Sequence, residues 1–300
     1  MNQTDDIGLS QDDELQKKKK MLEDIKREME RIRSYTPKVG VFGDTGVGKS
    51  SLCNALFGKD VAKISDVEAC TREPQEILIG DHKESGISLI DVPGVGEDPE
   101  RHKEYIELYK KLAPTLDLIL WAIKADDRKY SSSLDVYKSI LEPNIERCPV
   151  IFVITQVDKI EPHRDWNLDE NKPGKKQEAN LHIKINDVSS RFNVATNKII
   201  PVSSSDSYNL VNLVNKVVEV LPNEKKYAFT REAKEENVSE EAAKNAEKGI
   251  FDHIKEKIGE AWDSVKDEVT EIAIGVVKEY APIIAKKALS WMKSIWGKKV

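Results

Sequence analysis

The chain has 300 residues, of which 39% are hydrophobic and 33% are charged. This length can bury one sizeable core and a smaller second one, and the high charged fraction is typical of a globular domain with long solvated helices. No apolar run is long enough for an ordinary membrane span, so we expect none. The net charge of −6 argues against general nucleic-acid binding, and we predict no DNA partner.

The cysteines are sparse and scattered, at Cys53, Cys70 and Cys148. They form neither a disulfide framework nor a zinc site, and they fit a reducing cytosol. The first ten residues are acidic and polar, unlike a signal peptide. We therefore expect a cytoplasmic protein.

Residues 1–36 are predicted to form a helix. Ser10 is a suitable N-cap, and acidic residues follow it where the helix dipole favours negative charge. A narrow apolar stripe then recurs at helical spacing on an otherwise charged rod, at Leu15, Leu22, Ile25, Met29 and Ile32. Pro37 marks the end of this element.

Residues 37–222 alternate between short apolar runs and amphipathic segments. The apolar runs are 38–43, 76–80, 87–92, 116–123, 150–155 and 198–202. The helical patterns between them are 49–57, 99–112, 132–145, 177–188 and 207–221. This alternation predicts an α/β domain with a mostly parallel six-stranded sheet. The polar stretch 162–176 contains Pro-Gly and is predicted to be an exposed insertion.

Residues 223–300 lack strand signals. Residues 223–250 contain few large apolar residues, which suggests a solvated helix or a flexible linker. An apolar stripe from Phe251 to Val276 has a period near 3.6 and predicts one straight amphipathic helix, which Pro282 should end. A last helix is predicted over 283–296. The apolar stripe of residues 1–36 needs a partner, so we expect both chain ends to form one α-helical domain.

The segment 43–50 reads Gly-Asp-Thr-Gly-Val-Gly-Lys-Ser and matches the phosphate-binding pattern G-x-x-x-x-G-K-[ST]. Glycines let successive backbone N–H groups face a phosphate, the lysine reaches the β- and γ-phosphates, and the serine hydroxyl ligates Mg²⁺. An apolar strand precedes the loop and a helix follows it, which disfavours an ordinary glycine-rich turn. The candidate nucleotide-binding residues here are Asp44, Thr45, Gly46, Val47, Gly48, Lys49, Ser50 and Ser51.

Two downstream segments could complete a magnesium site. Asp91 ends an apolar strand and opens the sequence Asp-Val-Pro-Gly, in which Asp91 can hold Mg²⁺ through water and the Gly94 N–H can bond a γ-phosphate. Thr71 lies in a predicted loop between the first helix of the domain and the next strand, where its hydroxyl could join the Mg²⁺ shell. A common turn and a surface threonine are the alternatives. The candidate metal ligands are Ser50, Thr71 and Asp91, and the candidate catalytic residues are Lys49, Thr71 and Gly94.

Two further segments could contact a base. Thr155-Gln156-Val157-Asp158 follows an apolar run, and the Asp158 carboxylate there could accept both N1–H and the 2-amino group of guanine. Adenine offers no such donor pair, so Asp158 would select GTP over ATP. Near Ser203 and Ser204 a backbone N–H could reach guanine O6, although a serine-rich helix cap explains this segment equally simply.

These motifs occur in the order found in TRAFAC-class GTPases, and the chain resembles an Era/septin-like P-loop GTPase. Within that group it resembles a bacterial family related to the immunity-related GTPases, through the phosphate loop and the segment 117–128 (Asp-Leu-Ile-Leu-Trp-Ala-Ile-Lys-Ala-Asp-Asp-Arg). The resemblance covers residues 37–222. It implies GTP and GDP binding with Mg²⁺, slow hydrolysis and switch loops. It also implies the family roles of Lys49, Ser50, Thr71, Asp91, Gly94 and Asp158, phosphate contacts from Gly46 and Gly48, and a base contact from Ser204.

The chain departs from the family pattern at two places. Thr155 and Gln156 replace the Asn and Lys of the usual Asn-Lys-x-Asp, which should weaken affinity while Asp158 keeps specificity. Val95 stands where many GTPases have a water-orienting Gln. The missing catalytic group could come from a second subunit facing across the nucleotide or from a loop residue of the same chain such as Arg72. We favour the first source and expect a homodimer across the nucleotide.

The charge is unevenly divided at the C-terminal end. Residues 223–280 carry a net charge of −5 and residues 281–300 carry +5, so the total conceals a basic tail. The last predicted helix is cationic and amphipathic with two tryptophans, which fits either a membrane surface or internal packing. The leading interpretation is a nucleotide-dependent switch. The alternatives are a dynamin-like or immunity-related membrane-associated assembly protein, whose C-terminal helices would bind membrane or a protein effector, and a P-loop ATPase or kinase.

Overall fold

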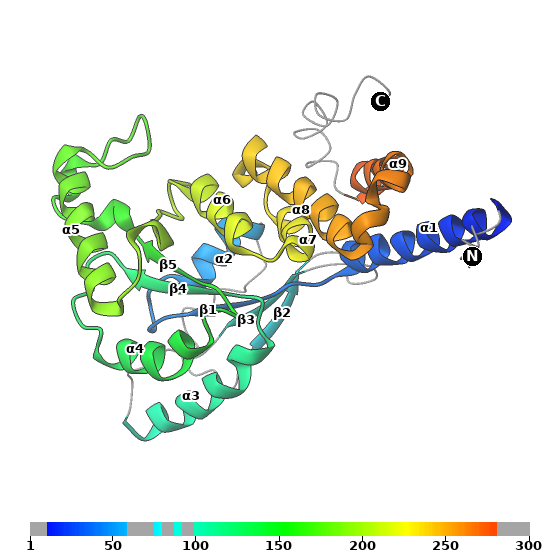
Figure 1. Cartoon of the computed structure of the whole chain (residues 1–300). Coiled ribbons are helices and arrows are strands. Elements are labelled where there is room, and N and C mark those ends of the chain that lie inside the picture. The colour runs from blue at the N-terminus through cyan, green and yellow to red at the C-terminus, as the bar shows by residue number, and fades with distance from the viewer. Residues whose placement is uncertain (1–10, 59–74, 80–86, 92–98, 281–300) are drawn as a thin grey trace, which may run out of the picture.

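A computed structural model describes residues 11–58, 75–79, 87–91 and 99–280. In these residues one sheet with the strand order β2-β3-β1-β4-β5-β6 is flanked by helices on both faces (Figure 1). Every neighbouring pair is parallel except β2 with β3. The predicted α/β class with a mostly parallel sheet is therefore confirmed.

The elements lie close to their predicted positions. The strands are β1 (Lys38–Phe42), β2 (Gln75–Ile79), β3 (Ile87–Asp91), β4 (Leu118–Lys124), β5 (Val150–Thr155) and β6 (Ile199–Pro201). The helices are α1 (Gln11–Ser34), α2 (Lys49–Phe57), α3 (Pro99–Leu112), α4 (Ser131–Val136), α5 (Lys175–Phe192), α6 (Leu210–Val220), α7 (Asn223–Glu232), α8 (Glu240–Ile258) and α9 (Trp262–Tyr280).

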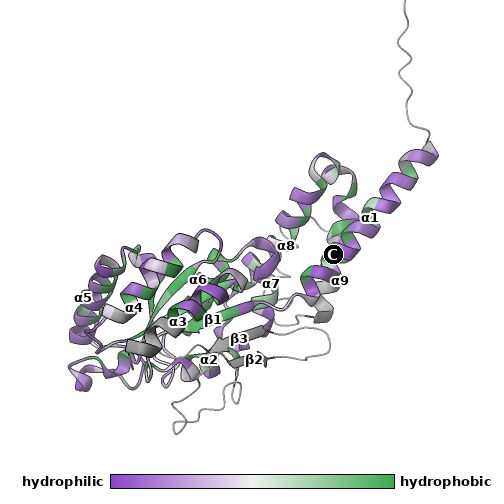
Figure 2. Ribbon diagram, turned by 90° about the horizontal axis from the view of Figure 1, so that it is seen from below, coloured by the Kyte–Doolittle hydropathy of each residue, from purple (hydrophilic) through white to green (hydrophobic). Residues whose placement is uncertain are grey.

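Apolar side chains of the strands point alternately to the two faces of the sheet, and each face packs against helices in its own core. Leu118 and Leu120 of β4 belong to the core that includes α2 and α6. Ile119 and Trp121 belong to the opposite core, with α3, α4 and α5. Figure 2 shows hydrophobic strands between helices that carry many hydrophilic residues. This burial on both faces explains why the strands read as continuous apolar runs.

The two ends of the chain pack together. Helix α1 lies beside α7, α8 and α9 (Figure 1). Its buried residues Ile25, Met29 and Ile32 join the same core as those helices and one face of the sheet. The helical end is thus continuous with the core of the sheet, and the division into 1–36, 37–222 and 223–300 remains a prediction.

The prediction that residues 223–250 are solvated or flexible was wrong. They form α7 and most of α8, in which Ala242, Ala243 and Ala246 are fully buried. A Cβ on Gly249 would lie only 2.8 Å from the Asn223 carbonyl oxygen. Small residues let α7 and α8 approach closely, so the lack of large apolar side chains reflects tight helix packing rather than exposure to solvent.

The single helix predicted from Phe251 to Val276 is interrupted. Helix α8 ends at Ile258, Gly259 has a φ of 61°, and α9 begins at Trp262. This positive φ at Gly259 ends the first helix, and a purely periodic pattern cannot show such a break. The predicted last helix and the basic tail lie outside the described residues. Among the residues that are described, no helix has both the length and the hydropathy to cross a membrane.

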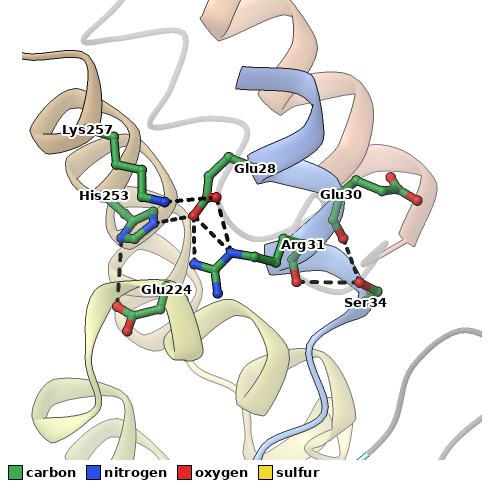
Figure 3. Close-up of polar contacts among 7 residues, drawn as sticks. All are labelled: Glu28, Glu30, Arg31, Ser34, Glu224, His253 and Lys257. Carbon is green, nitrogen blue, oxygen red and sulfur yellow. Dashed lines mark hydrogen bonds and ion pairs between the residues drawn. The ribbon is translucent and has the colours of Figure 1, made fainter. Parts of the chain in front are cut away.

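An ion-pair cluster joins α1 to α7 and α8 (Figure 3). The Glu28 carboxylate accepts hydrogen bonds from Arg31 Nη2 at 2.6 Å and from Lys257 Nζ at 3.0 Å, and it lies 2.7 Å from His253 Nε2. The opposite ring nitrogen of His253 lies 3.8 Å from Glu224 of α7. The bond from Arg31, helped by His253 and Lys257, outweighs burial and lowers the pKa of Glu28 from 4.5 to about 2.

We expect Glu28→Gln to lower the free energy of unfolding by about 2 kcal/mol near neutral pH. A lowered carboxyl pKa stabilises the fold above the ordinary value of 4.5, and this contribution is lost as the pH falls towards 2. Urea unfolding of the variant and the parent should therefore converge in acid. Glu30→Gln, at an exposed glutamate of the same helix, is the matched control. Equal losses for both variants would contradict the prediction.

Candidate functional site

The loop 43–50 joins β1 to α2 at the carboxyl edge of the sheet, where ligands bind in open α/β folds. Three of its residues, Gly43, Gly46 and Gly48, have φ values of 141°, 77° and 90°. A Cβ on Gly43 would lie 2.3 Å from the Ala122 carbonyl oxygen of β4. Only glycine fits that conformation and that close approach, so the loop follows the strand edge tightly.

The loop side chains have the arrangement expected for binding phosphate. Lys49 Nζ curls back and donates to the carbonyl oxygens of Gly43 at 3.1 Å and Asp44 at 3.2 Å. Lys49 is also the first residue of α2, so the N–H groups of the first helical turn lie beside the loop. Ser50 is half-buried, Ser51 and Thr45 are exposed, and Val47 is buried.

A contact that the sequence did not predict holds the loop from the side. Ser133 Oγ of α4 donates to Asp44 Oδ1 at 2.9 Å, across 89 positions of the chain. Burial raises the pKa of Asp44, and the bond from Ser133 opposes that shift. No local pattern marks Ser133, because the contact exists only once α4 packs beside the loop.

Thr155 takes a structural position under the loop. Its buried hydroxyl lies 2.6 Å from the Val47 carbonyl oxygen and 3.3 Å from the Ile123 carbonyl oxygen. The residue that replaces the family's asparagine therefore joins the end of β5 to the loop and to β4. Its side chain is used by the protein itself, so we infer that Thr155 supports the site rather than contacting a base.

Gln156 contacts the same loop, and Asp158 lies two residues further along the chain. Gln156 has a left-handed conformation, with a φ of 55°, and its Nε2 donates to the Gly46 carbonyl oxygen at 3.3 Å. Among the described residues, Asp158 Oδ1 is buried and has no hydrogen-bond partner. A carboxylate oxygen without a partner, two residues from a contact with the loop, is a candidate acceptor for a donor group of a ligand.

The loop that carries Asp158 is fixed by a residue that the sequence interpretation missed. Gln177 of α5 is fully buried, and its Nε2 donates to the carbonyl oxygens of Asp158 at 3.3 Å and Ile160 at 2.9 Å. Lys184 lies two helical turns further along α5, and it donates to the Asp127 carbonyl oxygen and to the Tyr130 hydroxyl. Burial lowers the pKa of Lys184 to about 8. Helix α5 thus anchors two loops at this edge of the sheet.

The serine-rich segment has its own internal hydrogen bonds. Ser203 is buried, its hydroxyl contacts Ser205 and Asp206, and its backbone N–H donates to the Tyr208 carbonyl oxygen at 3.3 Å. The adjacent Val202 bonds both Ile154 and Val157, which brings the segment next to Asp158. The Ser203 carbonyl oxygen also accepts from the Tyr208 N–H at 2.9 Å, so its N–H, carbonyl and hydroxyl groups all have partners. Ser204, which is half-buried, remains the candidate for a base contact.

The candidate magnesium ligands are only partly described. Asp91 ends β3 and is paired in register with Val41 of β1, two residues before the phosphate loop. Asp91 thus ends the strand beside β1, while Ser50 lies in the first turn of α2. The oxygen donors of both residue types suit a hard cation such as Mg²⁺. Thr71, Gly94 and Val95 lie outside the described residues.

Part of the chain is similar in sequence to known GTPases. Residues 38–156 match the protein family described as 50S ribosome-binding GTPase. GTPase Era of Aquifex aeolicus is 27% identical over 187 residues, which cover 61% of this chain and 56% of Era. A crystal structure of Era in complex with MgGDPNP and part of 16S ribosomal RNA is 27% identical and covers 62% of this chain and 57% of that one, with a TM-score of 0.46.

A second relative carries no functional name. The uncharacterized protein YkfA of Escherichia coli K12 is 46% identical over 142 residues, which cover 47% of this chain and 48% of YkfA. The chain thus spans about half the length of YkfA. Residues 38–156 are thus similar to a GTPase family, and the strand order and the glycine-rich loop 43–50 are compatible with that similarity. Its relatives include the Era GTPases.

Proposed function

We propose that the chain binds GTP and GDP with Mg²⁺, hydrolyses GTP slowly, and acts as a nucleotide-dependent conformational or dimerisation switch. One observation carries this proposal. The buried, unpartnered Oδ1 of Asp158 lies on the segment whose neighbour Gln156 contacts the phosphate loop. Guanine presents N1–H and a 2-amino group side by side, which is the donor pair that such a carboxylate accepts.

In this proposal the chain supplies each part of the binding site from a different strand end. The loop 43–50 and Lys49 bind the phosphates, Ser50 and Asp91 hold Mg²⁺, and Asp158 selects the base. When bound, Mg²⁺ would neutralise charge that develops on the phosphates. Thr71 and Gly94 are proposed to sense the γ-phosphate, as the resemblance to the family implies.

The test is a swap of base specificity. Xanthine has a carbonyl oxygen where guanine has its 2-amino group, so an amide at position 158 would suit xanthine. We expect Asp158→Asn to weaken GTP binding roughly 100-fold and to strengthen XTP binding, measured by titration with fluorescent nucleotides. Asp169→Asn, at an exposed carboxylate of the 162–176 insertion, is the matched control and should change neither. Equal affinity of the parent chain for ATP and GTP would contradict the guanine assignment and would favour an ATPase or kinase.

The hydrolysis step is proposed to need a second copy of the chain. Val95 cannot hydrogen-bond an attacking water, and the resemblance is to families that are activated by dimerisation. GTP turnover per molecule should therefore rise with protein concentration. The relation to septin-like and immunity-related GTPases, and binding of a membrane surface or an effector through the C-terminal helices, remain proposals from the sequence. The basic segment that motivates the membrane role lies outside the described residues.

A further inference from the structure

Two side chains form a hydrogen-bond relay above the phosphate loop. Gln156 Nε2 donates to the Gly46 carbonyl oxygen at 3.3 Å, and Lys159 Nζ donates to Gln156 Oε1 at 3.1 Å. The Gln156 amide nitrogen thus donates to the loop, and the amide oxygen accepts from the lysine. Through the amide, the lysine ammonium is connected to the loop carbonyl.

The backbone sets this geometry. Gln156 is left-handed at φ 55° and ψ 39°, and residues Val157–Lys159 form one 3₁₀ turn. The Lys159 N–H donates to the Gln156 carbonyl oxygen at 3.0 Å, so residues 156 and 159 are joined through both main chain and side chain. This turn brings the lysine side chain back over the glutamine amide. The same turn carries Asp158, which has its buried, unpartnered oxygen.

We propose that Lys159 is a nucleotide-positioning residue, which supplies through Gln156 the cationic contact to the loop that a lysine at position 156 would make directly. A glutamine alone offers a neutral donor to the Gly46 carbonyl. The ammonium of Lys159 polarises the amide, and hydrogen bonds in such chains strengthen one another. The relay holds the base-binding turn against the phosphate loop, so that a nucleotide bound to the loop meets a fixed Asp158.

This inference rests on the proposed guanine-nucleotide function. It implies that the effect of Lys159 on nucleotide affinity depends on which residue stands at position 156. In the parent chain, loss of the Lys159 ammonium removes the charge from the relay. If a lysine stands at position 156, its own ammonium reaches the loop and Lys159 becomes dispensable. A general electrostatic attraction of Lys159 for phosphates would instead act equally in both backgrounds.

The experiment is a double-mutant cycle on the full chain, with affinity for GDP and its dissociation rate measured with a fluorescent GDP analogue. We expect Lys159→Ala to weaken GDP binding about three- to tenfold, mainly through faster dissociation, and Lys159→Arg to stay within about twofold of the parent. In the Gln156→Lys background, Lys159→Ala should cost less than about twofold. Lys138→Ala, at an exposed lysine outside the relay, is the control, and thermal unfolding checks that each variant is folded.

Three results would overturn the proposal. They are no loss for Lys159→Ala in the parent chain, an equal loss in the Gln156→Lys background, and loss of unfolding stability that accounts for the weaker binding. These results are separate from failure of the proposed function. In that case the parent chain itself would not bind guanine nucleotides in preference to adenine nucleotides, and the role of Lys159 would fall with it.

Discussion

Glu247→Gln should raise the free energy of unfolding by about 3 kcal/mol at pH 7. Glu247 lies on α8 with no exposed surface, between Ala243, Ala246 and Ile250 of the main core. Among the described residues neither of its carboxyl oxygens has a hydrogen-bond partner. Burial alone raises the pKa of the carboxyl from 4.5 to about 8. The side chain is therefore neutral in the folded protein and ionised in the unfolded chain at neutral pH.

The sign of the pH dependence follows from this raised pKa. The contribution of Glu247 to the free energy of unfolding is most favourable below pH 4.5 and declines as the pH rises to about 8, because the unfolded chain releases a proton that the folded chain retains. Urea unfolding at several pH values should show the parent weakening over this range while Glu247→Gln does not. The two proteins should be nearly equal in mild acid.

An exposed glutamate of the same helix separates this effect from a general loss of negative charge. Glu241→Gln should leave the pH dependence of unfolding close to that of the parent. Glu247→Met should stabilise the protein as well, since it replaces an unpaired polar group by an apolar one of similar length. A parent stability that does not change between mild acid and pH 8 would show that Glu247 has a hydrogen-bond partner in solution.

Gly43→Ala should cost about 3 kcal/mol of unfolding free energy and remove detectable nucleotide binding. The added methyl group would lie 2.3 Å from the Ala122 carbonyl oxygen, and the φ of 141° is unfavourable for any side chain. The backbone would have to withdraw from β4. The loop N–H groups, which we propose bind phosphate, would move with it.

Gly46→Ala is the comparison that isolates the close approach. Gly46 also has a positive φ, 77°, but a Cβ there would meet nothing within 4 Å. Only backbone strain remains, so the loss of stability should be about 1 kcal/mol. Thermal and urea unfolding of the two variants measures the difference. If both variants lose the same stability, the contact with Ala122 does not determine the loop conformation.

Much of the central sheet and its ligand edge could be predicted from local pattern. Apolar runs that are buried on both faces, such as Leu118–Lys124, have no competing helical period, and the phosphate loop has fixed glycines between a strand and a helix. The chain ends were harder. Ala242, Ala243 and Ala246 contribute little to a hydropathy pattern, yet they are buried. Only small side chains fit between α7 and α8, which pack closely.

The sequence by itself determined the α/β class, the phosphate loop and the position of Asp158, because those features depend on residue type and local spacing. Only the tertiary structure decided which groups support them. Ser133 meets Asp44 across 89 positions, Thr155 meets Val47 across 108, and Glu28 meets His253 across 225. Such contacts arise from the packing of whole elements, and a local sequence pattern cannot predict which distant residue will lie opposite.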